Sequence, residues 1–251
     1  MIVAQNLSIG YSGKTILNNI NFSLEKGKLI SLLGSNGIGK STLLKTITNL
    51  IPALSGSVLI QGTNTNTIKP LEFAKLVSLV LTKTTISKEL TVLELIKLGR
   101  QPYTNWLGID TDEDKKAIEL AIELCDVNHL INNKLSDLSD GQLQLALIAR
   151  AIAQDTPCIV LDEPSTHLDL FHKAKLFKLL KKLCTVENKT ILFSTHDLDL
   201  ALQLSDEIIV IKNQTLYHNT TDGIIEAGLF NNFFDTEDII FDKQLKIFRV
   251  V

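Results

Sequence analysis

The chain is poor in cysteine and has no long apolar run. It contains three cysteines, Cys125, Cys158 and Cys184, and they are widely spaced. An odd, scattered set predicts neither a disulfide framework nor a zinc site, so a reducing compartment is the default expectation. The longest apolar stretches, such as residues 29–33, have the length of a strand, whereas a membrane-spanning helix needs about 20 apolar residues. The N-terminus shows no signal pattern, so we expect a soluble chain that reaches a membrane only through a partner.

The chain also lacks an excess of charge of one sign. Its 25 Lys and Arg residues and 28 Asp and Glu residues give a formal net charge of −3. Affinity for nucleic-acid phosphates comes mostly from clustered basic side chains, so this balance argues against a general nucleic-acid binder. What the chain does have is hydrophobic residues, which make up 45% of its 251 residues. That content is sufficient for a sizeable core.

Short apolar runs alternate with longer amphipathic stretches along the chain. Four runs, at 29–33, 158–161, 190–193 and 208–211, are apolar at nearly every position. Such runs are typical of strands that are buried on both faces of a parallel sheet. Segments with helical spacing, such as 117–124, lie between them. The alternation predicts an α/β fold with a mainly parallel sheet and flanking helices.

Two regions differ from this pattern. Residues 2–9 and 16–24 mix apolar and polar positions at short spacing, which predicts an N-terminal antiparallel β-subdomain. Residues 88–155 are rich in helical patterns and follow an expected strand near 76–81. They have the position of an inserted helical subdomain within a single domain that we expect to span residues 1–251. A further helix is expected after the first apolar strand, with Leu43, Ile47, Leu50 and Ile51 on one face and a stop at Pro52.

Residues 34–42 form a phosphate-binding motif. They read GSNGIGKST and fit G-x-x-x-x-G-K-[ST], with an expected strand before the loop and a helix after it. Glycines permit the turn, and backbone N–H groups and the helix N-terminus attract phosphate oxygens. Lys40 would reach the β- and γ-phosphates, and the Ser41 hydroxyl would bind Mg²⁺. The nucleotide-binding candidates in the loop are Gly34, Ser35, Asn36, Gly37, Ile38, Gly39, Lys40, Ser41 and Thr42.

Two carboxylates, Asp162 and Glu163, follow the apolar strand at 158–161. Ligands of open α/β sheets bind at the carboxyl ends of the strands. Asp162 could hold Mg²⁺, directly or through water. Glu163 could act on an attacking water, provided that it lies within hydrogen-bond reach of the water's proton. Further upstream, Ser139 and Gln142 form a capping-box pattern before a long helix, and capping alone explains both residues.

In this order, the segments resemble the nucleotide-binding subunit of an ATP-binding cassette (ABC) transporter over nearly the whole chain. Residues 34–42 resemble the Walker A loop, and residues 138–142, which read LSDGQ, resemble the LSGGQ signature. Asp162 and Glu163 resemble Walker B with its catalytic glutamate. Residues 165–169 resemble the D-loop, which contains Asp169, and residues 194–197 resemble the segment that carries the switch histidine, His196. The resemblance implies a P-loop NTPase core that hydrolyses ATP with Mg²⁺.

The resemblance also implies how the site is completed. Tyr11 stands where the family keeps an aromatic residue that stacks on adenine. Glu163 would orient water, and His196 would contact the γ-phosphate. Two copies of the chain would sandwich two ATP molecules, and the signature of each copy would contact the nucleotide bound by the phosphate loop of the other. The signature candidates are Ser139, Asp140, Gly141 and Gln142.

Partners follow from the resemblance as well. Residues 91–103 and the His167-Leu168-Asp169 form of the D-loop resemble importers of ferric siderophores, haem and cobalamin. The implied partners are a second copy, a two-fold transmembrane permease and, indirectly, an extracytoplasmic substrate-binding protein, with no nucleic acid. The implied location is the cytoplasmic face of the cell membrane. The patch around 101–107, with Tyr103 and Trp106, is a candidate docking surface for a permease helix.

The chain departs from the family pattern at four positions. Thr82 stands where the family has a glutamine that touches Mg²⁺ and the attacking water, and it is a shorter candidate ligand. Asp140 replaces a signature glycine, and its carboxylate would be repelled by a γ-phosphate unless it points away. Ser35 and Ile38 replace the usual proline and alanine of the loop, which is tolerable because the loop acts through its backbone.

Two alternatives remain from the sequence. A non-transport ABC ATPase of DNA repair or chromosome organisation would carry a long coiled coil between the phosphate loop and the signature, for which the interval from Lys40 to Ser139 leaves no room. A translation-associated cassette protein usually has two cassettes in one chain. The other alternative is a non-hydrolysing regulatory subunit, which the missing glutamine and Asp140 favour and which Glu163 and His196 oppose.

Overall fold

A six-stranded sheet forms the centre of the protein. The computed structural model describes residues 1–11, 13–82, 86–104, 109–231, 233–234, 236 and 238–251. The sheet has the strand order β10-β9-β3-β8-β7-β6, and only β10 is antiparallel to its neighbour. Its strands are β3 (Leu29–Leu33), β6 (Val77–Val80), β7 (Cys158–Asp162), β8 (Thr190–Ser194), β9 (Glu207–Lys212) and β10 (Thr215–Thr220).

Both faces of the central sheet are covered, as the apolar runs predict. In β7, Cys158 and Val160 pack into one hydrophobic core, whereas Ile159 and Leu161 pack into another on the opposite face. The four predicted apolar strands coincide with β3, β7, β8 and β9, and the expected strand near 76–81 is β6. The predicted α/β fold with a mainly parallel sheet is therefore confirmed.

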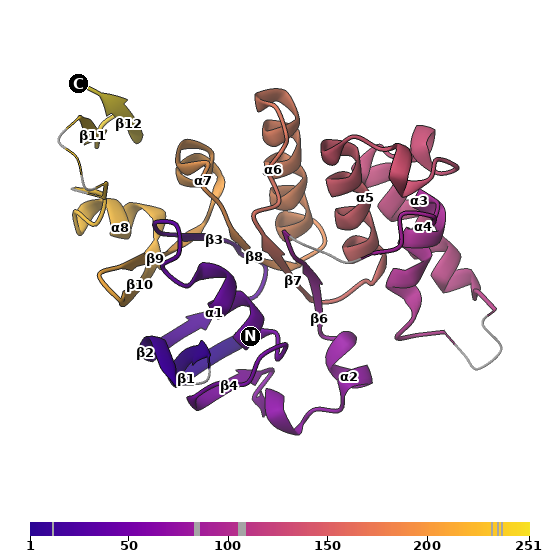
Figure 1. The fold of residues 1–251 in the computed structure, drawn as a ribbon, viewed down its shortest axis with the longest axis horizontal. Coiled ribbons are helices and arrows are strands. Elements are labelled where there is room, and N and C mark those ends of the chain that lie inside the picture. The colour runs from indigo at the N-terminus through magenta and orange to yellow at the C-terminus, as the bar shows by residue number, and fades with distance from the viewer. Residues whose placement is uncertain (12, 83–85, 105–108, 232, 235, 237) are drawn as a thin grey trace.

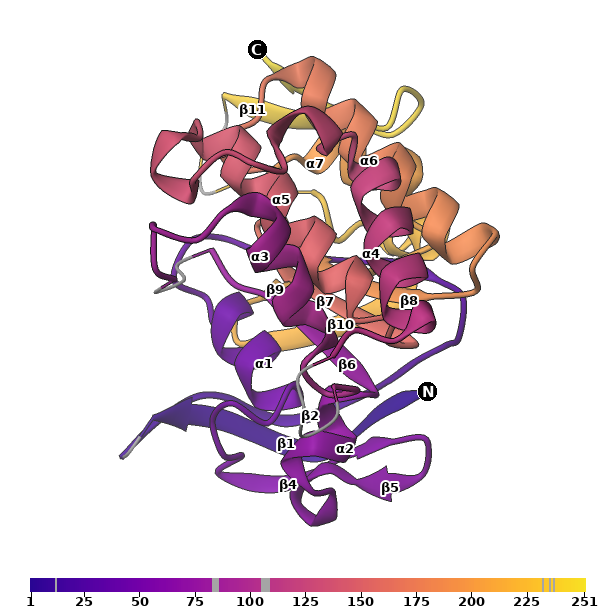
Figure 2. The same cartoon turned by 90° about the vertical axis from the view of Figure 1, so that its right-hand side faces the viewer.

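A separate antiparallel sheet lies below the first in Figure 1. Its order is β2-β1-β4-β5, and its strands are β1 (Ile2–Tyr11), β2 (Lys14–Leu24), β4 (Ser55–Ile60) and β5 (Thr63–Asn64). The prediction of antiparallel N-terminal strands is confirmed. Helix α1 (Lys40–Ile47) lies between the two sheets (Figures 1 and 2). Its buried residues Leu43, Leu44 and Ile47 pack into one hydrophobic core with side chains from both sheets.

The predicted helix through Ile51 is too long by one turn. Helix α1 ends at Ile47, and Leu50 is 56% exposed. The cause is Asn49, which adopts a left-handed conformation with φ of 57°. The N–H groups of Asn49 and Leu50 then donate to the carbonyl oxygens of Thr46 and Lys45, at 3.0 and 2.9 Å. This pair of hydrogen bonds is a Schellman motif, which closes a helix.

Helices also cover the face of the central sheet that is opposite α1. Helix α6 (Leu170–Thr185) runs beside α5 (Asp140–Ala153), and α3 (Val92–Lys97) and α4 (Asp112–Cys125) pack outside α5 (Figure 1). A buried ion pair joins this group, because Nε of Arg100 lies 2.7 Å from Oδ1 of Asp114. Of the short elements, η1 (Thr65–Thr67) contacts β4 and α2 (Pro70–Ala74) contacts β6. The others are η2 (Leu98–Arg100), η3 (Asn128–Leu130) and η4 (Leu135–Asp137).

The C-terminal elements form a third core beside β9. They are α7 (Leu198–Leu204), α8 (Thr221–Glu226), β11 (Ile239–Asp242) and β12 (Ile247–Val250). Phe230 is 1% exposed, and its ring centroid lies 5.0 Å from that of Phe241 and 5.8 Å from that of Phe248. These aromatic contacts fasten the β11–β12 hairpin to the body. Across the described part of the chain, none of the helices combines the length and the apolarity that spanning a membrane requires.

Candidate functional site

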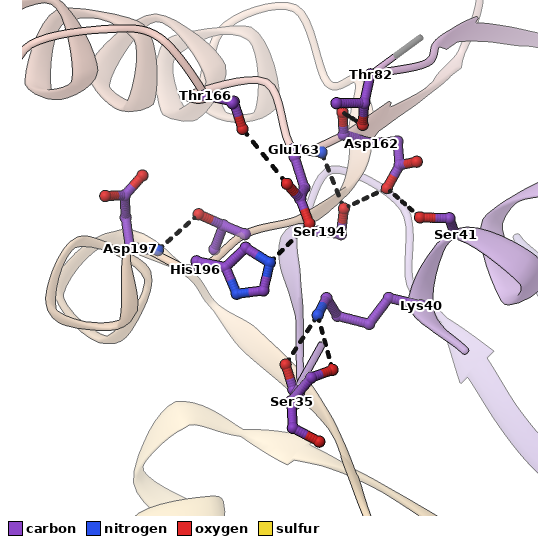
Figure 3. A network of polar contacts seen from close by, with 12 residues as sticks. Ser35, Lys40, Ser41, Thr82, Asp162, Glu163, Thr166, Ser194, His196 and Asp197 are labelled. Carbon is purple, nitrogen blue, oxygen red and sulfur yellow. Dashed lines mark hydrogen bonds and ion pairs between the residues drawn. The ribbon is translucent and has the colours of Figure 1, made fainter. Parts of the chain in front are cut away.

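The parallel register of the central sheet brings three loops together at one edge. Asp162 at the end of β7 pairs with Ser194 at the end of β8, and Leu32 of β3 lies on the other side of Ser194. Parallel strands end at the same edge, so the loops that follow these strands meet there. The loops carry the phosphate-binding motif, Glu163 and His196, and Figure 3 shows their side chains facing one another.

Lys40 lies folded against the phosphate loop. Its Nζ atom donates to the carbonyl oxygens of Gly34, at 2.8 Å, and Ser35, at 3.2 Å, and the residue is 5% exposed. Burial lowers the pKa of the Lys40 ammonium, and the negative charges of Glu163 and Asp162 act in the opposite direction. A hydrogen bond from an ammonium group to an anionic oxygen is stronger than one to a carbonyl. Lys40 is therefore positioned to exchange these carbonyl partners for phosphate oxygens.

Glycine is favoured at two positions of the loop. Gly37 and Gly39 have φ values of 75° and 114°, which side chains disfavour. A Cβ atom at Gly39 would also lie 2.6 Å from Cγ2 of Ile16 in β2. Beside the loop is a cavity of about 150 Å³, lined by Asn36, Gly37, Gly39, Lys40, Ser41, Thr42 and Glu163. The structure thus brings Glu163 into the same cavity as the predicted phosphate-binding residues.

Asp162 is the centre of a group of hydroxyls. Its Oδ1 atom accepts hydrogen bonds from Oγ of Ser194, at 2.7 Å, and Oγ of Ser41, at 3.1 Å, and the residue is 3% exposed. Ser41 and Asp162 therefore offer adjacent oxygen ligands of the kind that Mg²⁺ prefers. Thr82 is oriented differently, because its hydroxyl donates to the carbonyl oxygen of Asp162 at 3.0 Å. The expectation that Thr82 ligates a metal stays a prediction.

Glu163 and His196 contact each other directly. Oε1 of Glu163 lies 2.7 Å from Nε2 of His196 (Figure 3). Glu163 has a left-handed backbone, with φ of 51°, and its N–H donates to Oγ of Ser194 at 2.9 Å. Such a conformation costs of order 1 kcal/mol outside glycine, and backbone strain of this kind clusters at active sites and ligand clamps. Thr166 donates to the second carboxylate oxygen at 3.4 Å.

Sequence reasoning missed the hydroxyls that hold the two carboxylates. Ser194 contacts both Asp162 and the backbone of Glu163, and Thr166 contacts the Glu163 side chain. The signal for Ser194 was available. Ser194 is the first residue after the apolar run 190–193, and Asp162 is the first residue after the run 158–161. If both runs are strands of one parallel sheet, their carboxyl ends lie at the same edge, which places Ser194 beside Asp162.

The predicted signature residues lie at the start of α5. The capping box is formed, because Ser139 Oγ accepts from the Gln142 N–H at 3.3 Å and Gln142 Oε1 accepts from the Ser139 N–H at 3.0 Å. Asp140 is the first residue of the helix and is exposed. A cleft next to it is lined by Ser139, Asp140, Gly141, Gln142, Leu145, His167, Leu168, Asp169 and His172. Within one chain, the signature therefore adjoins the predicted D-loop and lines a different hollow from Glu163.

Asp169 and Tyr11 have simpler surroundings. Asp169 caps α6, because its Oδ1 atom accepts from the N–H of His172 at 2.9 Å. Tyr11 is the last residue of β1 and is 52% exposed, as an aromatic residue available for stacking would be. In the predicted docking patch, Trp106 lies outside the described residues, whereas the Tyr103 ring centroid lies 4.1 Å from the Arg100 guanidinium carbon.

Comparison with known proteins decides the family. Residues 17–166 match the family described as ABC transporter. The chain belongs to the ABC transporter family. The achromobactin transport ATP-binding protein CbrD of Dickeya dadantii is 36% identical to this cassette over 237 residues, which are 94% of this chain and 88% of CbrD. The petrobactin import ATP-binding protein YclP of Bacillus subtilis is 36% identical over 236 residues, which are 94% of this chain and 93% of YclP.

Solved cassettes share the fold. The dimeric structure of MJ0796, a bacterial ABC transporter cassette, superposes on 88% of this chain and 99% of its own, with a TM-score of 0.79 and 29% identity. The agreement confirms that the two sheets and the helices described above are those of an ABC cassette. The post-hydrolysis MJ0796 dimer, with ADP and Pi bound, matches with a TM-score of 0.78 and 28% identity.

Proposed function

We propose that this cassette is the ATP-hydrolysing subunit of an importer for iron chelates, with siderophores as the leading class. The observation that carries hydrolysis is the contact between Glu163 and His196, at 2.7 Å, beside the cavity of the phosphate loop. A carboxylate that shares a cavity with the phosphate-binding residues can take a proton from an attacking water. The contact supports an active ATPase over a non-hydrolysing subunit.

The other residues of the site would stabilise charge. Lys40 and the N-terminus of α1 would bind the β- and γ-phosphates, and His196 would contact the γ-phosphate. Ser41 and Asp162 fit a Mg²⁺ ion, because their side-chain oxygens are 3.1 Å apart and both are ligands that this ion uses. When bound, the ion would neutralise charge on the phosphates. Tyr11 would stack on the adenine.

A second copy would complete each site. Ser139, Gly141 and the N–H groups at the start of α5 line a cleft apart from the phosphate loop, so one chain does not bring the two halves together. Two copies facing each other would place the signature of one over the γ-phosphate bound by the other. The MJ0796 cassette is a dimer in its solved structure, which supports this arrangement.

The role in import rests on the relatives. CbrD is named for achromobactin transport and YclP for petrobactin import. We extend this role to the cassette, which would bind a two-fold permease at the cytoplasmic face of the membrane. An extracytoplasmic binding protein would deliver the substrate to that permease. The decisive test is a pull-down of the tagged chain from detergent-solubilised membranes, combined with ATPase assays. A polytopic permease at a one-to-one ratio and turnover that Lys40→Ala abolishes would support the proposal, and a wholly soluble chain with no membrane partner would refute import.

A further inference from the structure

The residue after His196 is held by contacts to two other parts of the chain. Oδ1 of Asp197 accepts from Nζ of Lys173 in α6 at 2.6 Å. Its Oδ2 atom accepts from the hydroxyl of Ser165, in the segment that follows Glu163. The N–H of Asp197 donates to Oγ1 of Thr195 at 3.0 Å. Asp197 thus connects the histidine turn to both the glutamate turn and α6.

The hydroxyl protons can be assigned from these contacts. Oγ of Ser165 lies 3.4 Å from Oγ1 of Thr195, and either atom could donate. Ser165 has one hydroxyl proton, and a carboxylate attracts it more strongly than a neutral hydroxyl does. Thr195 therefore donates to Ser165, while its own oxygen accepts from the N–H of Asp197. The three residues form a closed ring in which every proton has an acceptor.

The ring is shielded from water. Ser165 and Thr195 are 3% and 1% exposed. The side chains of Asp197 and Lys173 are 22% and 26% exposed, whereas those of a second ion pair on α6, Lys175 with Asp126, are 53% and 69% exposed. Low exposure strengthens hydrogen bonds and reduces screening of the charges. The ring and Lys173 therefore form a firm clamp, whereas the Lys175 pair is an ordinary surface contact.

We propose that Asp197, together with Ser165 and Lys173, positions His196 against Glu163 for ATP hydrolysis. Ser165 lies two residues after Glu163, in the same turn. Thr195 and Asp197 flank His196. The clamp therefore connects the turn that carries Glu163 to the turn that carries His196. In Figure 3 the Asp197 carboxylate is directed away from the Glu163–His196 pair. Asp197 is therefore a positioning residue rather than a catalytic one. The inference rests on the proposed ATPase activity.

Steady-state kinetics of the full-length protein test the clamp. Asp197→Ala should lower kcat by about 10-fold to 100-fold, because small displacements of catalytic groups are costly, and should leave the KM for ATP within about twofold. Lys173→Met should lower kcat by a smaller factor. Lys173→Arg keeps the ion pair and should therefore have a kcat close to that of the wild type. Lys175→Met is the matched control and should not change kcat.

Two further measurements separate positioning from general damage. In a His196→Ala background, Asp197→Ala should cause no additional loss, because the group that it positions is gone. The ¹⁵N NMR shifts of the His196 ring, assigned with His196→Gln, should change in Asp197→Ala and Lys173→Met and stay the same in Lys175→Met. Equal losses in both backgrounds, or unchanged ring shifts, would overturn the clamp.

The outcomes distinguish the clamp from the proposed function. A wild-type chain without ATP turnover would refute the ATPase, and the ring shifts would then decide the clamp alone. If Asp197→Ala does not fold, Lys173→Met and Lys173→Arg provide the same comparison with milder changes. In that case, His196 ring shifts that change in Lys173→Met but match the wild type in Lys173→Arg support the clamp. Ring shifts that stay unchanged in Lys173→Met refute it.

Discussion

Glu163 and His196 are 33 positions apart in the chain, and their side chains meet at 2.7 Å between Oε1 and Nε2. The contact follows from the parallel pairing of β7 with β8, which places Asp162 beside Ser194 and so sets the two following turns next to each other. The roles proposed for the two residues, orienting water for Glu163 and contacting the γ-phosphate for His196, need this proximity. A substitution at Glu163 should therefore affect hydrolysis more directly than one elsewhere in the chain.

Replacing Glu163 with glutamine should stop hydrolysis and stabilise an ATP-bound dimer. Glutamine keeps the shape of the side chain but cannot accept the proton of water, so turnover should fall by about 100-fold or more. Light scattering during gel filtration with ATP would measure the dimer. Glu187→Gln, at an exposed position, is the control and should behave as wild type. A Glu163→Gln protein that binds ATP and remains monomeric at high concentration would contradict the sandwich arrangement.

Removing the Thr82 hydroxyl should weaken hydrolysis without abolishing it. Thr82→Val keeps the volume and removes the hydrogen bond, 3.0 Å long, that the Asp162 carbonyl oxygen accepts. The loss of one such bond, about 1 kcal/mol, corresponds to a fall in kcat of about fivefold. Thr185→Val, which removes an exposed hydroxyl at the far end of α6, is the control. Unchanged turnover in Thr82→Val, both alone and with the permease, would show that this hydroxyl has no role.

The sequence predicts the central sheet better than it predicts where individual elements end. Continuous apolar runs identify β3, β7, β8 and β9 because both faces of these strands are buried. The phosphate loop is readable because its glycines, lysine and serine occur at fixed spacing. The end of α1 was missed, since a single left-handed residue, Asn49, ends the helix while the apolar spacing continues to Ile51.

Contacts between distant residues were the hardest part to predict. The ring of Asp197, Thr195 and Ser165 depends on the register between β7 and β8 and on the bend at Glu163. A motif states which residue types are present, but a hydrogen-bond ring also requires their relative orientation. The tertiary structure supplies that orientation, and it explains how a polar residue outside the recognised motif positions, such as Lys173, contacts the segment that carries His196.

Breaking the buried ion pair of the helical region should destabilise the protein strongly. Side chains of Arg100 and Asp114 are only 6% and 2% exposed. Arg100→Met would leave Asp114 buried without its cation, which costs about 3–5 kcal/mol. Urea unfolding would measure the loss. Lys115→Met, which breaks an exposed pair with Asp112, should change stability by less than about 1 kcal/mol and is the control. A loss in Arg100→Met as small as that of the control would contradict the structural role of the pair.

The same carboxylate should give the fold a specific acid sensitivity. Burial by itself raises the pKa of Asp114, but hydrogen bonds from Thr111 and Arg100 outweigh it and hold the pKa below the usual value of 3.8. A carboxyl group whose pKa is lower in the folded state stabilises the fold above its unfolded-state pKa. That stabilisation is lost as the pH falls through the folded-state value.

Comparing wild type with Asp114→Asn isolates this contribution. Asparagine keeps an acceptor for the Thr111 cap but carries no charge, so the difference in unfolding free energy should be constant near neutral pH and shrink below about pH 4. Other carboxyls with lowered pKa values affect both proteins equally and cancel; these are the side chains of Glu94, Asp126, Asp169 and Asp242. Urea titrations at intervals between about pH 6 and about pH 2.5 would give the curve. A difference that stays constant over this range would show that Asp114 does not couple folding to protonation.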